Sequence, residues 1–169
     1  MVWNKKLRHD STWIQHVIPL QPSPNPTNGF KTKVIEIGES IIADQNVGIE
    51  IGLATKLDSS LKTPHEWNKF GCHFNVLNGG IYHKLIHPMN FVERAESNDV
   101  VEWTLTCSNT EDGQLSKLAV LKINGETKGK PLQLKGGEDL FPTIHIASTG
   151  AKVEAGYHDM TYPTKVKGK

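Results

Sequence analysis

Histidines are the first residues in this chain that could do chemistry, and there are eight of them among 169 residues. Half of them fall in one region with a cysteine: His65, His73, His83, His87 and Cys72. Zinc sites usually show tight ligand pairs at fixed spacing, such as CxxC or HExxH. Cys72 and His73 are adjacent, so in a strand their side chains point to opposite faces. Pro88 follows His87, and no helix frames that pair, so we expect no metal site and no cofactor.

Nucleophilic catalysis needs a nucleophile together with a base and an orienting group. Ser, His and Asp are all present, but no GxSxG elbow or cysteine-centred signature accompanies them. Thr149-Gly150-Ala151 is typical of a turn, and the acidic pairs Glu111-Asp112 and Glu138-Asp139 are typical of solvated turn residues. We therefore expect no catalytic residues and no enzyme. A hydrolase that uses the histidine cluster is the alternative, and metal analysis of the purified protein would test its metal-dependent form.

The segment Asn124–Pro131 contains Gly-Lys in a glycine-rich context, which raises the possibility of phosphate binding. Pro131 stands where GxxxxGK[ST] requires Ser or Thr, and Pro131–Leu134 reads as extended rather than as the start of a helix. We expect Asn124-Gly125 to close the turn after a strand at Leu118–Ile123. We expect this to be more than a simple two-residue hairpin, with Thr127–Lys130 leading into a short extended piece at Pro131–Leu134.

Charge and composition exclude several other classes of function. The net charge is +1, and the lysines are spread along the chain among acidic residues, so we expect no nucleic-acid partner. No apolar run approaches the roughly 18 residues of a membrane span, and the start lacks the apolar core of a signal peptide. Without a secretory signal, we expect Cys72 and Cys107 to be free thiols and the protein to be intracellular, cytoplasmic or nuclear.

The elements that would position any site are short strands separated by turns. Apolar residues alternate with others in Val47–Ala54, Val101–Cys107, Ala119–Ile123 and Ala151–Tyr157, and no window has a long apolar stripe at helical spacing. Such alternation predicts an all-β, antiparallel β-sandwich with little helix, in which each sheet buries one face. We expect Trp67, Trp103 and Tyr82 to belong to the core.

Several segments in order resemble the motifs of SPRY domains. Val47–Thr55 is similar to the family's "VGIGVAT" strand, and Gly79–His83 resembles its "G…YH". Asn98–Leu105 sits where the family has "GDVIGVLLD", and Ile123–Leu132 where it has "NGKxLGxAF". Two further segments match "LyPavsl" and "gakvevnf", namely Asp139–Ile146 and Gly150–Glu154. The order and spacing of these motifs cover most of the chain between Phe30 and Tyr157.

The resemblance implies a bent, concanavalin-like sandwich in residues 30–160. We also expect an N-terminal extension in 1–29 that packs on it and a flexible basic tail in 161–169. SPRY domains are protein-interaction modules that need no cofactor. We therefore expect a monomeric domain, a substrate receptor or scaffold in a larger protein or complex, that binds a protein or short peptide. A role in substrate recognition by a ubiquitin ligase is one form of this expectation. The alternative within the same fold is a carbohydrate-binding, lectin-like domain.

Carried over by position, the family's ligand-contacting loops assign binding residues in loops at one end of the sandwich: Ala54, Thr55, Lys56, Leu57, Ser148, Thr149 and Gly150. We expect the N-terminal loop to lie nearby, and we add its residues Asn25, Thr27 and Asn28 to the assigned set. In the SOCS-box adaptor branch, "ATAD" and "VWG" help to form a peptide pocket. Here Lys56-Leu57 replaces the acidic end of the first motif, and Thr149 replaces the Trp of the second. The known peptide specificity of that branch is therefore not carried over to this chain.

Overall fold

Strands joined by turns make up the regular structure of this chain. The computed structural model describes residues 2–4, 12–24, 29–40, 48–56, 71–83, 89–109, 112–113, 115–134, 138–158 and 160–163. No helix occurs within these ranges, and hence none that is long and apolar enough to cross a membrane. The expectation of an all-β fold is confirmed.

Two six-stranded antiparallel sheets form the molecule, together with one small pair of strands. Sheet A has the order β1 (Val2–Asn4), β14 (Lys152–Gly156), β3 (Phe30–Glu36), β9 (Val100–Asn109), β10 (Leu115–Ile123) and β11 (Glu126–Leu134). Sheet B has the order β2 (Thr12–Gln15), β12 (Phe141–Ile146), β5 (Ile49–Ala54), β6 (Cys72–Asn75), β7 (Gly80–His83) and β8 (Asn90–Phe91). The small pair joins β4 (Glu39–Ser40) to β13 (Ser148–Thr149).

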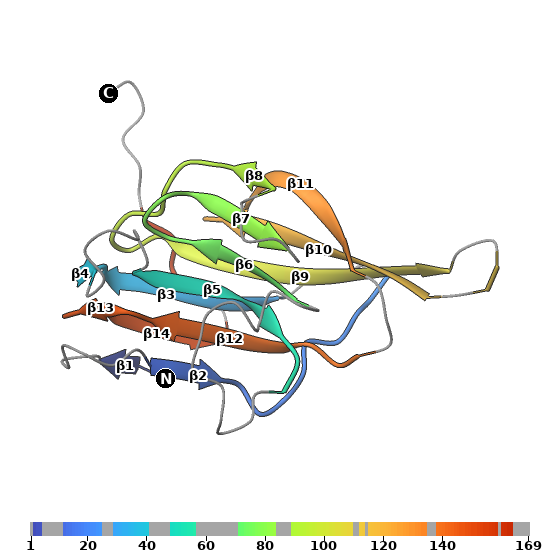
Figure 1. Ribbon diagram of the computed structural model, residues 1–169, viewed down its shortest axis with the longest axis horizontal. Helices are drawn as coiled ribbons and strands as arrows, with labels where there is room; N and C mark the ends of the chain where they lie inside the picture. Colours follow the sequence, from blue (N-terminus) through green and yellow to red (C-terminus); the bar gives the residue numbers. More distant parts are fainter. Residues whose placement is uncertain are drawn as a thin grey trace.

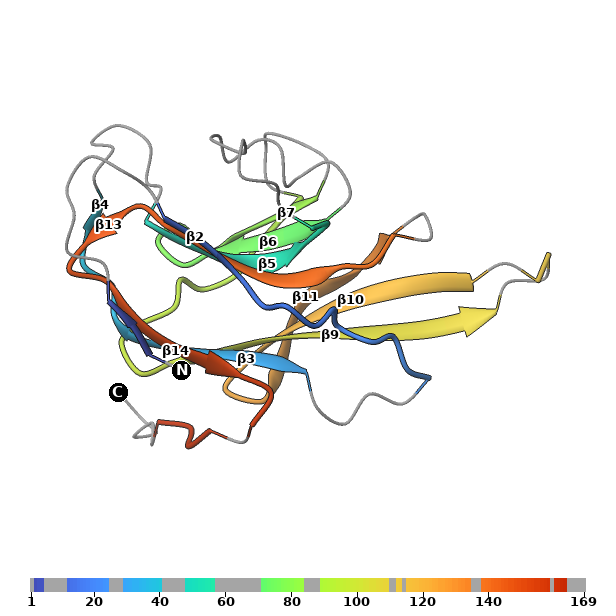
Figure 2. The same ribbon diagram turned by 90° about the horizontal axis from the view of Figure 1, so that it is seen from below.

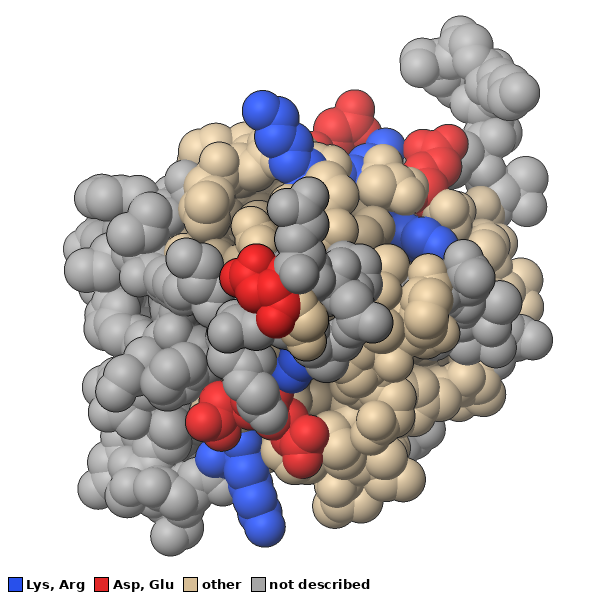
Figure 3. Space-filling view, turned by 90° about the vertical axis from the view of Figure 1, so that its right-hand side faces the viewer, with Lys and Arg blue, Asp and Glu red and all other residues tan. Residues whose placement is uncertain are grey.

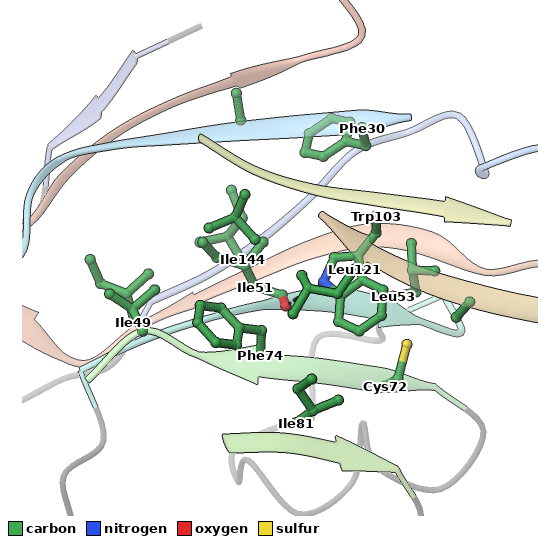
Figure 4. Close-up of a cluster of buried hydrophobic side chains, with 14 of the residues drawn as sticks. Phe30, Ile49, Ile51, Leu53, Cys72, Phe74, Ile81, Trp103, Leu121 and Ile144 are labelled. Carbon is green, nitrogen blue, oxygen red and sulfur yellow. Dashed lines mark hydrogen bonds between the residues drawn. The ribbon is translucent and has the colours of Figure 1, made fainter. Parts of the chain in front are cut away.

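The two sheets lie one over the other as the layers of a sandwich (Figures 1 and 2). Their facing side chains form the core, in which Ile49, Ile51, Phe74 and Trp103 are almost completely buried (Figure 4). Each such side chain contributes roughly 1.5–3 kcal/mol relative to an exposed one. Trp103 reaches from β9 across the interior and donates its indole N–H to the carbonyl oxygen of Ile51 at 2.9 Å. Its predicted place in the core is confirmed, whereas Trp67 lies outside the described residues.

Sheet B buries more than the one face that alternation predicts. All six residues of β5 are buried, including Glu50 on the face that points away from sheet A. Tyr82, expected in the core, is only half-buried and stacks on His73, with ring centroids 4.6 Å apart. The prediction fails here because polar side chains on the outer face of sheet B are buried against one another.

The turn at Asn124-Gly125 is a two-residue hairpin loop, which corrects the expectation of a longer connection. Ile123 pairs directly with Glu126, and β11 extends from Glu126 to Leu134, with a shift of register between its pairing at Lys128 and at Leu132. Asn124 and Gly125 have φ angles of 54° and 83°, as a type I′ turn requires. The polar residues after the turn belong to β11 because it is an edge strand, most of whose side chains face solvent.

The N-terminal residues contribute an edge strand to each sheet. β1 pairs with β14 at one edge of sheet A, and β2 pairs with β12 at the corresponding edge of sheet B. Because Gln15 pairs with Thr143, β2 ends close to the start of β12. The chain beyond β2 therefore emerges beside Phe141, next to the point where β5 ends at Ala54.

Candidate functional site

The assigned binding residues fall at two opposite ends of the sandwich. In the antiparallel pair of β5 and β12, Ala54 is opposite Phe141 and Ile49 is opposite Ile146. Residues 54–56 therefore lie at one end, the Ala54 end, and residues 148–150 lie at the other, the Ile49 end. The two segments do not form one surface, contrary to the expectation of loops gathered at a single end. The motif alignment places both loops along the chain, but only strand direction determines which end each loop occupies.

Exposure differs among these residues. At the Ala54 end, Ala54 is buried, Thr55 is half-buried and Lys56 is exposed. At the Ile49 end, Ser148 is buried, whereas Thr149 and Gly150 are exposed. The remaining assigned residues, Asn25, Thr27, Asn28 and Leu57, lie outside the described residues. Lys56, Thr149 and Gly150 are thus the assigned positions whose side chains or backbone a partner could reach most directly.

A groove of about 330 Å³ opens at the Ala54 end. It is lined by residues from three segments: Gln15, His16, Val17, Pro19, Lys56, Asp139 and Phe141. Figure 3 looks onto this end of the molecule, where acidic and basic side chains stand beside a broad surface of other residues. The groove therefore combines apolar walls with one exposed cation, Lys56, and one exposed carboxylate, Asp139.

Gln15 ties the walls of this groove together. Its side-chain N–H groups donate to the carbonyl oxygen of Thr55 and to the hydroxyl oxygen of Thr143, both at 3.0 Å. The Thr143 hydroxyl in turn donates to the carbonyl oxygen of Phe141 at 2.8 Å. One amide group thus links β2, the end of β5 and the start of β12, and holds Lys56 beside the N-terminal segment.

A turn at His16–Ile18 presents two large apolar side chains to solvent at the same end. Val17 is 86% exposed and Ile18 is 55% exposed. The backbone on either side is fixed, because the N–H of His16 donates to Pro142 at 2.9 Å and that of Leu20 donates to Leu140 at 2.8 Å. The apolar side chains are therefore held out by an ordered backbone.

Three aromatic rings pack against one another beside this turn. The rings of His16, Phe30 and Tyr157 meet edge to face, with centroids between 5.1 and 5.5 Å apart. The Tyr157 hydroxyl donates to the carbonyl oxygen of Ile18 at 3.4 Å. Burial raises the pKa of Tyr157 to about 12, so its hydroxyl keeps its proton at physiological pH.

The Ile49 end carries a different groove, of about 420 Å³. It is lined by Ile37, Gly38, Val76, Leu77, Arg94, Ala95, Glu96 and Ser97. None of Ser148, Thr149 and Gly150 is among these lining residues. Thr149 pairs instead with Glu39 in the short ladder of β4 and β13. At this end the assigned residues and the groove therefore do not coincide, whereas at the Ala54 end Lys56 lines the groove directly.

A buried carboxylate between two imidazoles occupies the outer face of sheet B. His145 Nδ1 and His73 Nε2 donate to the two oxygens of Glu50 at 2.7 and 2.8 Å. His145 stacks on Trp13 at 4.2 Å, and His73 stacks on Tyr82. Burial by itself would raise the pKa of Glu50, but the hydrogen bonds and charge of the two histidines outweigh it and lower that pKa to about 2. The carboxylate is therefore ionised and fully engaged in holding sheet B together.

Of the four histidines considered as metal ligands, His65 and His87 lie outside the described residues, and the other two, His73 and His83, do not converge. His73 faces Glu50 on the outer face of sheet B, whereas His83, paired with Cys72, bonds to the carbonyl oxygen of Gly71 at 2.7 Å. Within the described ranges no three His, Cys, Asp or Glu side chains are grouped to hold a metal ion. Burial raises the pKa of the Cys72 thiol far above its usual range, which keeps it protonated and unreactive. Cys107 is also a free thiol.

Sequence reasoning missed most of the groove at the Ala54 end. Val17–Leu20 is visible as an apolar run before a proline-rich stretch, but nothing in its pattern shows that Val17 and Ile18 face solvent. The sequence predicts that Asp139 is a solvated turn residue, and its side chain is exposed. Its place in the same groove as Lys56 depends on the pairing of β5 with β12, which no sequence pattern shows. Gln15 carries no motif at all.

Comparisons with known proteins agree on the fold. No protein-family model matches the chain, and no curated protein matches it in sequence. Among solved structures, the chain is similar to a human SPRY domain with a TM-score of 0.69 at 16% identity, over 90% of this chain and 88% of that one. It is also similar to the SPRY domain of human HERC1, with a TM-score of 0.58 at 13% identity, over 90% of this chain and 86% of that one.

These similarities identify the fold. The chain has a SPRY-like fold, an antiparallel β-sandwich in which two six-stranded sheets face each other. The resemblance read from the order of the sequence motifs is confirmed at the level of the fold.

Proposed function

We propose that this chain is a non-enzymatic protein-interaction module that binds a short segment of a protein partner in the groove at the Ala54 end. The observation that carries the proposal is the turn at Val17 and Ile18, where two large apolar side chains are mostly exposed beside that groove. Apolar side chains that gather beside a groove on an ordered backbone are typical of contact surfaces. The SPRY-like fold supports the same function.

The physical basis of binding is apolar burial on a surface that is already in place. Covering Val17 and Ile18 would remove apolar area from water, at roughly 25 cal/mol per Å². The hydrogen bonds of Gln15 and of the backbone around His16 hold the groove before a partner arrives, so little conformational entropy is lost on binding. Lys56 and Asp139 would fix the direction of the bound segment through its own charged side chains or polar backbone.

The proposal extends to the setting in which the module works. A domain that recognises a segment of another protein without altering it can serve as a substrate receptor or as a scaffold, in a monomeric form and without a cofactor. The partner we propose is a protein rather than a nucleic acid, because acidic and basic side chains of the described residues stand side by side at this end (Figure 3).

Selection from a displayed random-peptide library against the folded domain tests the proposal. The dissociation constant of each selected peptide is then measured by fluorescence anisotropy for the wild type and for Val17→Asp and Lys56→Glu. We expect Val17→Asp to weaken binding about tenfold or more, because it places a charge against the buried part of the contact. Lys56→Glu should change which charge the selected peptides carry at the residue that contacts position 56 of the domain.

Thr149→Trp is the matched control, because Thr149 is an exposed assigned residue at the opposite end of the sandwich. It should leave the affinity unchanged. Peptides that lose affinity with Thr149→Trp but not with Val17→Asp would move the site to the Ile49 end. Failure to select any peptide that binds the folded domain would refute peptide recognition itself.

A further inference from the structure

The imidazole of His16 acts as a hydrogen-bond acceptor. The backbone N–H of Ile18 donates to Nδ1 of His16 at 3.1 Å. An imidazole nitrogen accepts a hydrogen bond only when it carries no proton, so His16 is neutral in this arrangement, with its proton on Nε2. The turn that exposes Val17 and Ile18 is thus closed by a bond that only one protonation state of His16 can make.

Protonation of this ring would reverse the interaction. A proton on Nδ1 would point a second donor at the N–H of Ile18, so an attractive contact would become a repulsive one. The ring also has little freedom to turn away, because Phe30 and Tyr157 pack edge to face against it. The backbone hydrogen bonds of His16 and Leu20 would remain, but the segment between them would lose the bond that fixes Ile18, and Val17 and Ile18 would no longer be held in their positions beside the groove.

We propose that His16 is a positioning residue that makes partner binding at the Ala54 end dependent on pH, with the turn in its binding form only while His16 is neutral. This inference rests on the proposed function of the groove. Binding is strong while Nδ1 of His16 carries no proton, and it is lost as the pH falls and that nitrogen becomes protonated.

The other ionisable groups around His16, among the residues that the structure describes, do not produce the same behaviour. Tyr157, which packs on the ring, has its pKa raised to about 12 by burial and keeps its proton throughout this pH range. Lys56 and Asp139 are the charged side chains on the other walls of the groove. Neither carries an imidazole, so neither can change from hydrogen-bond acceptor to donor at Nδ1 as His16 does. Phe30 and the carbonyl oxygen of Pro142, which accepts the N–H of His16, do not ionise.

The experiment follows the affinity of a selected peptide that contains no histidine, from about pH 7.5 to about pH 5.5. The wild type should lose affinity by up to about tenfold per pH unit once His16 becomes protonated. His16→Asn is the decisive variant, because an Asn oxygen accepts the same bond from the N–H two residues on and does not titrate. Its affinity should be independent of pH. His16→Phe, which has no acceptor, should bind weakly at every pH.

A second readout tests the inference without any partner. The exchange protection of the Ile18 amide, measured by NMR, should fall with His16 protonation in the wild type and stay constant in His16→Asn. Far-UV circular dichroism at each pH monitors the fold, and His158→Gln, which alters an exposed histidine, should behave like the wild type. An Ile18 amide that stays protected after His16 is protonated, or a His16→Asn variant as pH-dependent as the wild type, would overturn the inference. Absence of peptide binding at about pH 7.5 would instead count against the proposed function alone.

Discussion

The side chain of Gln15 donates a hydrogen bond of 3.0 Å to the backbone carbonyl oxygen of Thr55. This bond connects an N-terminal edge strand to the end of a central strand, across 40 positions of sequence. It fixes Lys56, the next residue, beside the turn that carries Val17. The N-terminal segment therefore does more than cover the sandwich, because it completes and holds the groove at the Ala54 end.

Replacing Gln15 with leucine should weaken both the fold and the groove. The substitution keeps the size of the side chain but removes the donors to Thr55 and Thr143, which should lower the free energy of unfolding by about 1–2 kcal/mol. The affinity for a selected peptide should fall as well, because the walls are no longer tied together. Urea unfolding and fluorescence anisotropy measure the two effects.

Gln133→Leu is the control for that substitution. Gln133 lies on the exposed edge strand β11, makes a side-chain bond of 3.4 Å to Ser116, and does not line the groove. It should change neither the peptide affinity nor, measurably, the stability. Equal losses of affinity in both variants would show that Gln15 has no particular role in the groove.

Glu50→Gln should destabilise the protein most at neutral pH. The pKa of Glu50 is lowered from 4.5 to about 2 in the folded state, so its contribution to stability is fully present above about pH 4.5 and is lost as the pH falls toward 2. At neutral pH the contribution is about 3 kcal/mol. Urea unfolding of the wild type and Glu50→Gln between about pH 7 and pH 3 measures how the difference shrinks.

An exposed glutamate and histidine provide the comparison for Glu50. Glu154 and His158 are 3.4 Å apart and solvent-accessible, and such pairs contribute little because water screens them. Glu154→Gln should therefore have no measurable effect at any pH. A Glu50→Gln variant as stable as the wild type at neutral pH would show that the two histidines do not stabilise the carboxylate.

Two substitutions at Asn124 separate its hydrogen bonds from its backbone conformation. The Asn124 oxygen accepts the N–H of Val100, and its side-chain N–H donates to Asp99, both at 2.9 Å. Asn124→Gly loses both bonds and should cost about 1–2 kcal/mol. Asn124→Ala loses the same bonds and also places alanine at a φ of 54°, which should cost about 1 kcal/mol more. Equal stability of the two variants in thermal unfolding would argue against strain at this position.

The fold was predictable because its signals are local and repeated. Alternation marks β5, β9, β10 and β14, and Asn124-Gly125 marks the hairpin between β10 and β11. The burial of Glu50 was not predictable, because it depends on His73 and His145, which reach β5 from neighbouring strands far along the chain. Pairwise contacts of this kind leave no periodic signal in the sequence.

The candidate site was predictable only in part, for a related reason. Lys56 lies at an exposed position after the end of β5, and its separation from Thr149 follows from the antiparallel register of β5 and β12. Motif order along the chain carries no information about which end of a sandwich a loop occupies. Gln15 and His16 act through single hydrogen bonds whose partners only the folded chain reveals.

The most direct test of the central claim is an NMR titration of the folded domain with a selected peptide, followed through backbone amide shifts. We expect the largest changes at residues 15–19, 54–56 and 139–141, which line the groove at the Ala54 end. Residues 148–150 and the groove from Ile37 to Ser97 should shift little, because they lie at the opposite end. Changes concentrated at the Ile49 end, with the Ala54 end unaffected, would contradict the proposed site.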